Sequence, residues 1–221
     1  MRVHTTQSRL NGGLLWVSVA ILLIPVGCSG GPDAVPIASF DPNQAADQAM
    51  EIYDQDQDGY IAGEELEQAA GINAALERID ANQDGKVSGD EMVERIRAWQ
   101  QMSIGYMNFN VDFTMDGRPL AGATVTFDPE PFLEDAIAPA VGMTTMAGST
   151  APSIPKEQRA SPDLPPGIQA GLYLVRVSKM VDGKETIPAK YNTATILGQE
   201  VAKDDPAINN KQVAFQLKST E

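Results

Sequence analysis

Apolar residues recur at helical intervals between about residues 42 and 104, and at alternate positions further along the chain. In the first region they follow one another every three or four positions, which is the spacing of one face of an α-helix. This spacing predicts a helix over 42–53, with Asp41 as its N-cap and Pro42 in its first turn. The apolar positions are Ala46, Ala49, Met50 and Tyr53 in this helix, then Leu66, Ala69, Ala70, Ile72, Leu76 and Ile79, and finally Met92, Val93, Ile96 and Trp99.

Beyond residue 105 the period changes to two. Alternation over 107–113, 123–127, 171–179 and 212–217 predicts short, half-buried strands. The dipeptides Asp116-Gly117 and Asp182-Gly183 are typical of hairpin turns, and the Pro-rich stretch 129–166 predicts long loops. Many short strands without a helical period favour an antiparallel β-sandwich. The predicted fold class is therefore α+β multidomain, a small helical part followed by an antiparallel β-sandwich.

Two twelve-residue acidic segments, 54–65 and 80–91, interrupt the helical region with the same spacing of oxygen-bearing side chains. Calcium takes six to eight hard oxygen ligands, and a loop with ligands at positions 1, 3, 5, 7 and 12 and glycine at 6 supplies them. Position 7 contributes its backbone carbonyl. The predicted metal ligands for two Ca²⁺ ions are Asp54, Asp56, Asp58, Tyr60 and Glu65, and then Asp80, Asn82, Asp84, Lys86 and Glu91.

These residues resemble the EF-hand family over roughly residues 42–101. The resemblance implies a pair of helix–loop–helix units, joined by a short strand contact between Ile61 and Val87 at the eighth loop positions. Only the 14 residues from Leu66 to Ile79 separate the loops. We therefore expect two brief helices there, of about two turns each, with their break at Gly71. The alternative interpretation is a pair of acidic surface turns without an ion.

Charge supports the metal interpretation and excludes one class of partner. The chain has a formal charge of −14, and residues 41–100 alone hold 15 acidic against four basic residues. The excess therefore lies in the segment that contains the predicted calcium loops. No basic stripe suits a phosphate backbone, so we expect no nucleic-acid partner.

The N-terminus resembles a bacterial lipoprotein signal. Arg2 and Arg9 precede an apolar run from Gly13 to Gly27, which ends at Cys28, the one cysteine of the chain. The resemblance implies lipidation of Cys28, export, and anchoring in a membrane through acyl chains, at the outer membrane or cell surface. Plain signal-peptide cleavage and an uncleaved anchor are the alternatives. The predicted organisation is a signal peptide over 1–28, a tether over 29–44, an EF-hand pair over 45–103 and a β-sandwich over 105–221.

The β region resembles the carboxypeptidase-regulatory-like, or transthyretin-like, domains of bacterial surface lipoproteins. The residues that carry the resemblance are Gly117 to Leu120, Gly171, Tyr173, Pro188 and Tyr191. It implies a structural or adhesive module, since this fold brings no catalysis by itself.

Catalytic side chains are scarce. The chain has one histidine, His4, within the predicted signal, so histidine triads and His/Cys zinc sites are not expected in the mature protein. We expect no enzyme. The favoured function is a calcium-binding, membrane-anchored extracytoplasmic protein, and the alternative is a calcium-responsive sensor or regulator of a surface protein partner. A sensor groove would use methionines, but Met50, Met92 and Met102 lie on predicted core faces.

Overall fold

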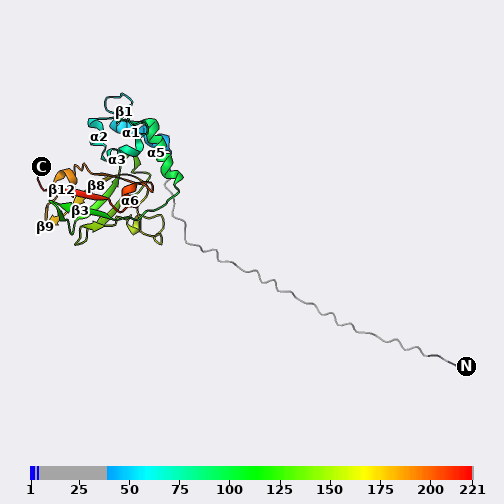
Figure 1. The fold of residues 1–221 in the computed structure, drawn as a ribbon. Coiled ribbons are helices and arrows are strands. Elements are labelled where there is room, and N and C mark those ends of the chain that lie inside the picture. The colour runs from blue at the N-terminus through cyan, green and yellow to red at the C-terminus, as the bar shows by residue number, and fades with distance from the viewer. Residues whose placement is uncertain (3, 5–38, 221) are drawn as a thin grey trace. The chain divides into compact units, whose positions relative to one another are not determined.

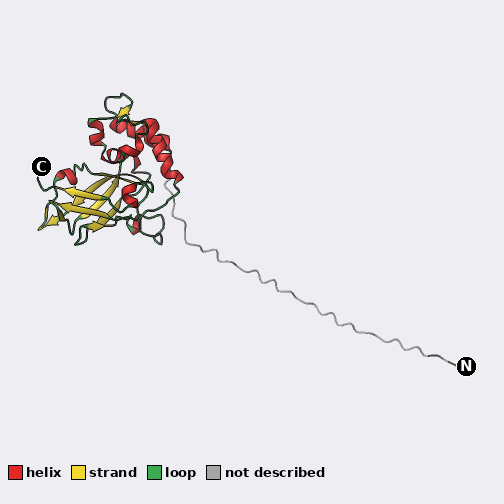
Figure 2. Cartoon of the chain, viewed as in Figure 1, coloured by secondary structure: helices red, strands yellow, loops and turns green. Residues whose placement is uncertain are grey.

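The structure, a computed structural model, describes residues 1, 2, 4 and 39–220. Apart from Met1, Arg2 and His4, the predicted signal peptide lies outside the described residues, as do Cys28 and the tether as far as residue 38. Residues 39–220 belong to one compact unit, in which helices gather at one end and sheets at the other (Figures 1 and 2). None of the helices in the described ranges is long and apolar enough to cross a bilayer.

Two amphipathic helices frame the helical part, as the apolar spacing predicts. α1 spans Pro42–Tyr53, and its N-cap Asp41 accepts a hydrogen bond from the backbone N–H of Asn43 at 2.9 Å. α5 spans Gly89–Gln101 and begins with a capping box between Ser88 and Glu91. Each helix buries its predicted apolar face, which removes these side chains from water and stabilises the helix pair.

The connection between the two loops differs from the prediction. It forms three short helices, α2 (Glu64–Gln68), α3 (Ala70–Ala74) and α4 (Leu76–Ile79). The expected break at Gly71 is wrong, because the helices are separated at Ala69 and Ala75 and Gly71 lies inside α3. Gly71 has a steric role instead. A Cβ there would collide with the carboxylate of Glu130, which approaches the backbone of α3 from the β part.

The β part consists of two four-stranded sheets. The first is antiparallel and has the order β11 (Gly198–Val201), β8 (Gly171–Ser178), β5 (Thr124–Pro129) and β6 (Ala140–Met143). The second has the order β12 (Ala214–Leu217), β3 (Val111–Met115) and β4 (Arg118–Pro119), with β7 (Ser149–Thr150) also paired to β3. A hairpin of β9 (Met180–Val181) and β10 (Lys184–Glu185) and a short α6 (Pro206–Asn209) complete this part.

The predicted strands are largely confirmed, with three corrections. Both hairpin turns occur, but in the first predicted strand only 111–115 is regular, and Met107 forms an isolated bridge with Ile168. The stretch 129–166 is not only loop, because β6 and β7 lie within it. The third correction is that β12 pairs with β3 in parallel, since the chain returns to this sheet by a long crossover rather than by a hairpin.

One apolar core runs through the helical and the β parts. It joins side chains such as Ile72 and Trp99 to side chains of the sheets such as Phe127 and Tyr173. α3 packs directly on β11 and β8, and the approach is so close that a Cβ at Gly198 would overlap the backbone carbonyl of Ala70. The division into separate domains near residue 104 stays a prediction. What the structure shows there is continuous packing between the two parts.

Candidate calcium-binding site

In the first loop, the ligand carboxylates converge. One carboxylate oxygen each of Asp54, Asp56 and Asp58 lies within 4.8 Å of the others. Backbone amides hold them in place: Gly59 N–H donates to Asp54 Oδ2 at 3.0 Å and Tyr60 N–H donates to Asp58 Oδ1 at 2.9 Å. Because the backbone fixes these carboxylates, the loop needs little rearrangement to offer them to a cation.

Glu65, at the twelfth position, closes the same loop. Its Oε1 accepts from the backbone of Gln55 at 2.8 Å, and its Oε2 accepts from the backbone of Ala62 at 3.0 Å. The Ala62 amide is the main cause of a pKa for Glu65 below the usual value, with smaller contributions from the amides of Gln55 and Asp56. The lowered pKa extends the pH range in which this carboxylate is ionised, as a calcium ligand must be, to lower pH than for an ordinary Glu.

The second loop repeats the arrangement. Asp80 accepts from the backbone of Asp84 at 3.1 Å and from that of Gly85 at 2.7 Å. Glu91 closes the loop by accepting from the backbone of Ala81 at 3.1 Å and of Ser88 at 2.9 Å. The remaining ligand side chains, Asn82 and Asp84, accept from the backbone amides of Asp84 and Lys86 at 2.9 Å each.

Both loops turn at their sixth residue. Gly59 has φ 87° and Gly85 has φ 78°, values in the left-handed region that glycine adopts without strain. The turn brings the first and fifth loop positions together on the same side of the chain. Both glycines therefore lie at the sixth loop position, where the predicted ligand pattern requires a turn.

The loops are joined to each other as predicted. β1 (Tyr60–Ile61) pairs with β2 (Val87–Ser88), with Ile61 opposite Val87 and both side chains fully buried. The position-7 side chains also meet, which the sequence did not indicate. The ammonium of Lys86 lies 4.8 Å from the centre of the Tyr60 ring and 3.8 Å from Asp58 Oδ2. The Lys86 side chain of the second loop thus contacts Asp58, a predicted ligand of the first loop.

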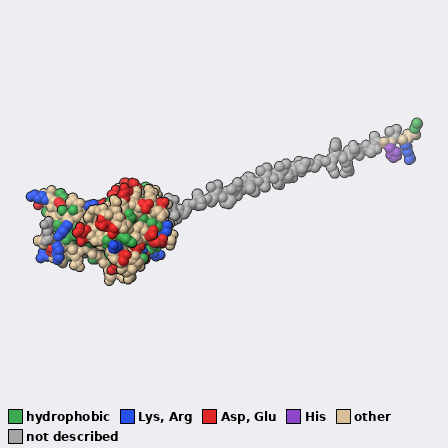
Figure 3. Space-filling view, turned by 90° about the horizontal axis from the view of Figure 1, so that it is seen from above, with side chains coloured by type: hydrophobic (Ala, Val, Ile, Leu, Met, Phe, Trp, Pro, Cys, Tyr) green, Lys and Arg blue, Asp and Glu red, His purple; other side chains and the backbone are tan. Residues whose placement is uncertain are grey.

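The donor set fits calcium. Every predicted ligand is an oxygen, four of them carboxylates in the first loop and three in the second, and no nitrogen or sulfur ligand stands among them. Seen from the side of the loops, the surface carries many Asp and Glu side chains, while Lys and Arg gather towards one end (Figure 3). This negative field favours divalent cations.

Two buried carboxylates of the β part, Glu130 and Glu200, each bond to two or more residues of the helical part, and no sequence pattern indicated this role. Glu130 is fully buried and accepts from the hydroxyl of Tyr53 at 2.5 Å and from the backbone of Gly71 at 2.6 Å. Burial raises the pKa of Glu130 above its ordinary value, against the effect of these two bonds. Burial and the nearby Glu130 charge also raise the pKa of Tyr53, so its hydroxyl remains a donor.

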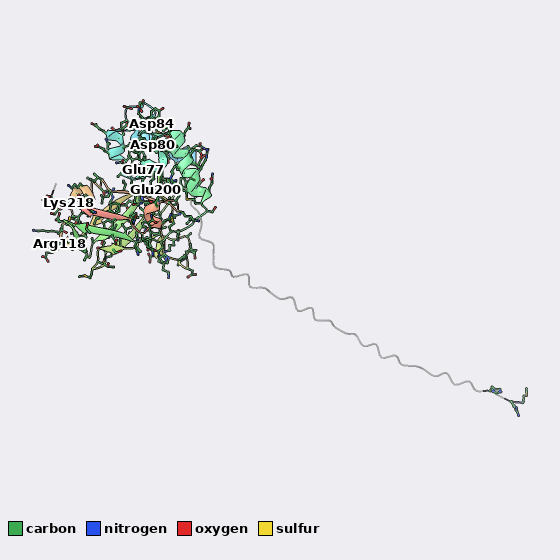
Figure 4. The ribbon with its side chains drawn as sticks, viewed as in Figure 1. Glu77, Asp80, Asp84, Arg118, Glu200 and Lys218 are labelled. Atoms are coloured by element: carbon green, nitrogen blue, oxygen red, sulfur yellow. The ribbon has the colours of Figure 1, made fainter. Side chains whose placement is uncertain are left out.

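The second carboxylate, Glu200 on β11, lies between the sheets and the helices that flank the second loop (Figure 4). It accepts from Arg78, from Arg95 Nε at 2.5 Å and from Trp99 Nε1 at 2.7 Å. Arg95 also forms two bonds to Asp204, at 2.7 and 2.8 Å. Burial alone would lower the pKa of Arg95, but its bonds to Asp204 and Glu200 hold this pKa above the usual value.

Comparison with known proteins supports the assignment of the second loop as an EF-hand loop. The family model described as "EF hand" matches residues 72–94, which contain the whole loop, α4 and the first part of α5. A search of curated proteins and a search of solved structures found no match. The chain therefore combines an EF-hand region, which supports calcium binding, with a β-sheet part in an α+β layout. The transthyretin-like and lipoprotein resemblances stay predictions.

Proposed function

We propose that the protein binds two calcium ions, one in each loop, and that these ions stabilise a structural or adhesive module. The observation that carries the proposal is the shared bonding scheme of the loops. In each, backbone amides of the fifth and sixth residues donate to the first carboxylate, and the twelfth carboxylate accepts from the backbone. The first loop lies outside the family match, and this common geometry is the reason for including it.

Packing favours a structural over a sensory role. Sensor EF-hands respond to calcium by opening a helix pair and exposing an apolar groove. Here the apolar faces of the helices already have a partner, because α3 packs on β11 and the indole of Trp99 bonds to Glu200. Met92 is fully buried, and Met50 packs against the core. Opening this pair would require the helices to leave the sheet.

Substituting the closing carboxylates tests ion binding. Glu65→Gln and Glu91→Gln keep the size of the side chain and remove the charge of a bidentate ligand. We expect each to weaken its own site by about 100-fold or more and the other site less, through the β1–β2 pairing. Calorimetric titration with calcium measures this, and exposed neighbours give matched controls, Glu64→Gln and Asp90→Asn. A protein that takes up fewer than two ions, or variants that bind like the original, would refute the assignment.

We further propose export and lipid anchoring through Cys28, on the basis of the N-terminal sequence. Two acyl chains hold a protein on a membrane far more firmly than one. Cys28→Ala should therefore release the protein from the membrane fraction or leave an unprocessed precursor, as measured by fractionation and by the mass of the mature chain. Cys28→Ser removes the same thiol and should behave alike. Unchanged partitioning with a normally sized product would contradict lipidation.

A further inference from the structure

Glu130 and Glu200 each contact both flanks of one calcium loop. Tyr53, which bonds to Glu130, directly precedes the first ligand position of loop one. Gly71, the other partner of Glu130, lies in α3, just beyond the helix that carries Glu65. The incoming and outgoing segments of loop one are thus tied to a single side chain.

Glu200 has the same relation to loop two. Arg78 lies two residues before the ligand Asp80, and Arg95 lies one helical turn after the ligand Glu91. Both guanidinium groups bond to the Glu200 carboxylate, and Trp99, a further turn along α5, bonds to it as well. The two segments that flank loop two therefore converge on one fully buried group.

A calcium ion imposes the same constraint from the other side. Ligands at positions 1 and 12 come from opposite ends of the loop, so an ion fixes the spacing of the two flanking segments. A group that already fixes this spacing lowers the ordering cost of binding and raises the affinity. From these contacts we infer that Glu130 and Glu200 are positioning residues, each setting the calcium affinity of one loop. This inference rests on the proposed binding of one ion per loop.

The coupling is reciprocal. We call the bonds of Glu130 and Glu200 to the loop flanks the anchor bonds. If the anchor bonds raise the calcium affinity by some factor, bound calcium must stabilise the anchor bonds by the same factor. The backbone amide of Gly71, which donates to Glu130, should therefore exchange with solvent more slowly in saturating calcium. The expected factor equals the loss of loop-one affinity when the anchor is removed.

The test is a calcium titration of the full-length protein in which NMR monitors the binding. The amides of Gly59 and Gly85 bond to Asp54 and Asp80, so their signals report each loop separately. Tyr53→Phe removes one hydroxyl and changes no charge near the ions. We expect it to weaken loop one by about tenfold, equivalent to about 1.4 kcal/mol, and loop two by less than about threefold. Glu130→Gln should act on the same loop, since its amide cannot accept both bonds.

For loop two the corresponding variants are Glu200→Gln and Trp99→Phe. Both should weaken the binding reported by Gly85 about tenfold and leave that reported by Gly59 within about threefold. Glu134→Gln and Glu157→Gln, at exposed positions of the β part, control for loss of negative charge. If Glu200→Gln does not fold, Trp99→Phe decides for this loop, as Tyr53→Phe does for the other.

The possible results separate the inference from the proposed function. Loop-selective weakening by the anchor variants supports the inference. If the unmodified protein binds two ions but the anchor variants change neither loop, or both loops equally, the inference is wrong and the proposed function stands. If the unmodified protein binds no calcium, both fail.

Discussion

Calcium is expected to raise the thermal unfolding midpoint of the protein by roughly 10–20 °C without exposing apolar surface. An ion that binds only the folded state adds about 2.7 kcal/mol per site at a hundredfold excess over its dissociation constant. Two sites would add about 5 kcal/mol, and 1 kcal/mol moves the midpoint of a chain of this size by about 2–4 °C. Extracellular EF-hand modules bind at roughly 10⁻⁴–10⁻³ M, so a hundredfold excess requires about 10–100 mM calcium.

Calorimetry in calcium and in chelator measures the shift, and a hydrophobic dye measures apolar exposure. Magnesium at the same concentration controls for ionic strength, and the double variant Glu65→Gln/Glu91→Gln should lose most of the shift. Dye binding should stay constant, because the apolar face of α3 is already covered by β11 and β8. A calcium-induced rise in dye binding would instead favour the alternative, a sensor with a surface partner.

Local patterns made the loops predictable. The ligand positions, the turning glycines and the buried Ile61 and Val87 all lie at fixed offsets within two short segments. The bonds that form there span ten residues or fewer within each loop, as between Gln55 and Glu65. Helical spacing likewise predicted α1 and α5, since their apolar faces repeat with the helical period.

Contacts between distant segments were not predictable in this way. Glu130 lies between two prolines, which predicts a loop position, yet it bonds to Gly71, 59 positions away. Nothing in the residues beside Glu200 shows that Arg78 and Arg95, more than 100 positions away, will share it. The parallel pairing of β12 with β3 is likewise set by how the whole sheet assembles.

The error at Gly71 has the same origin. A glycine within a helical pattern suggests a break, because glycine costs about 1 kcal/mol relative to alanine in a helix. In the structure the residue is helical, and its missing side chain makes room for Glu130. This glycine is required by Glu130 of the β part, a contact that the residues next to Gly71 in the sequence do not indicate.

Replacing Arg95 should destabilise the protein more than any exposed substitution. Arg95→Met keeps an unbranched apolar stem but removes two bonds to Asp204 and one to Glu200. Glu200 would then remain buried with fewer bonding partners. Breaking a buried pair by removing one member costs about 3–5 kcal/mol. Urea unfolding in calcium should show a loss of this order, against about 0.5 kcal/mol for Arg97→Met, which breaks only an exposed pair with Glu94.

A second substitution distinguishes loss of the ion pair from loss of packing. In Arg95→Met/Glu200→Leu the buried charge is gone as well, and apolar replacements of a buried pair are often close to neutral. Arg78 is partly exposed and can turn its guanidinium to solvent or to Asp205, so the double variant should recover part of the stability lost by Arg95→Met. Glu200→Leu alone completes the comparison. If the double variant loses as much stability as Arg95→Met and Glu200→Leu together, the two side chains act independently, through packing. Recovery would show that Arg95→Met is destabilised mainly by the buried Glu200 carboxylate that has lost one of its two cationic partners, and that the ion pair itself contributes little net stability.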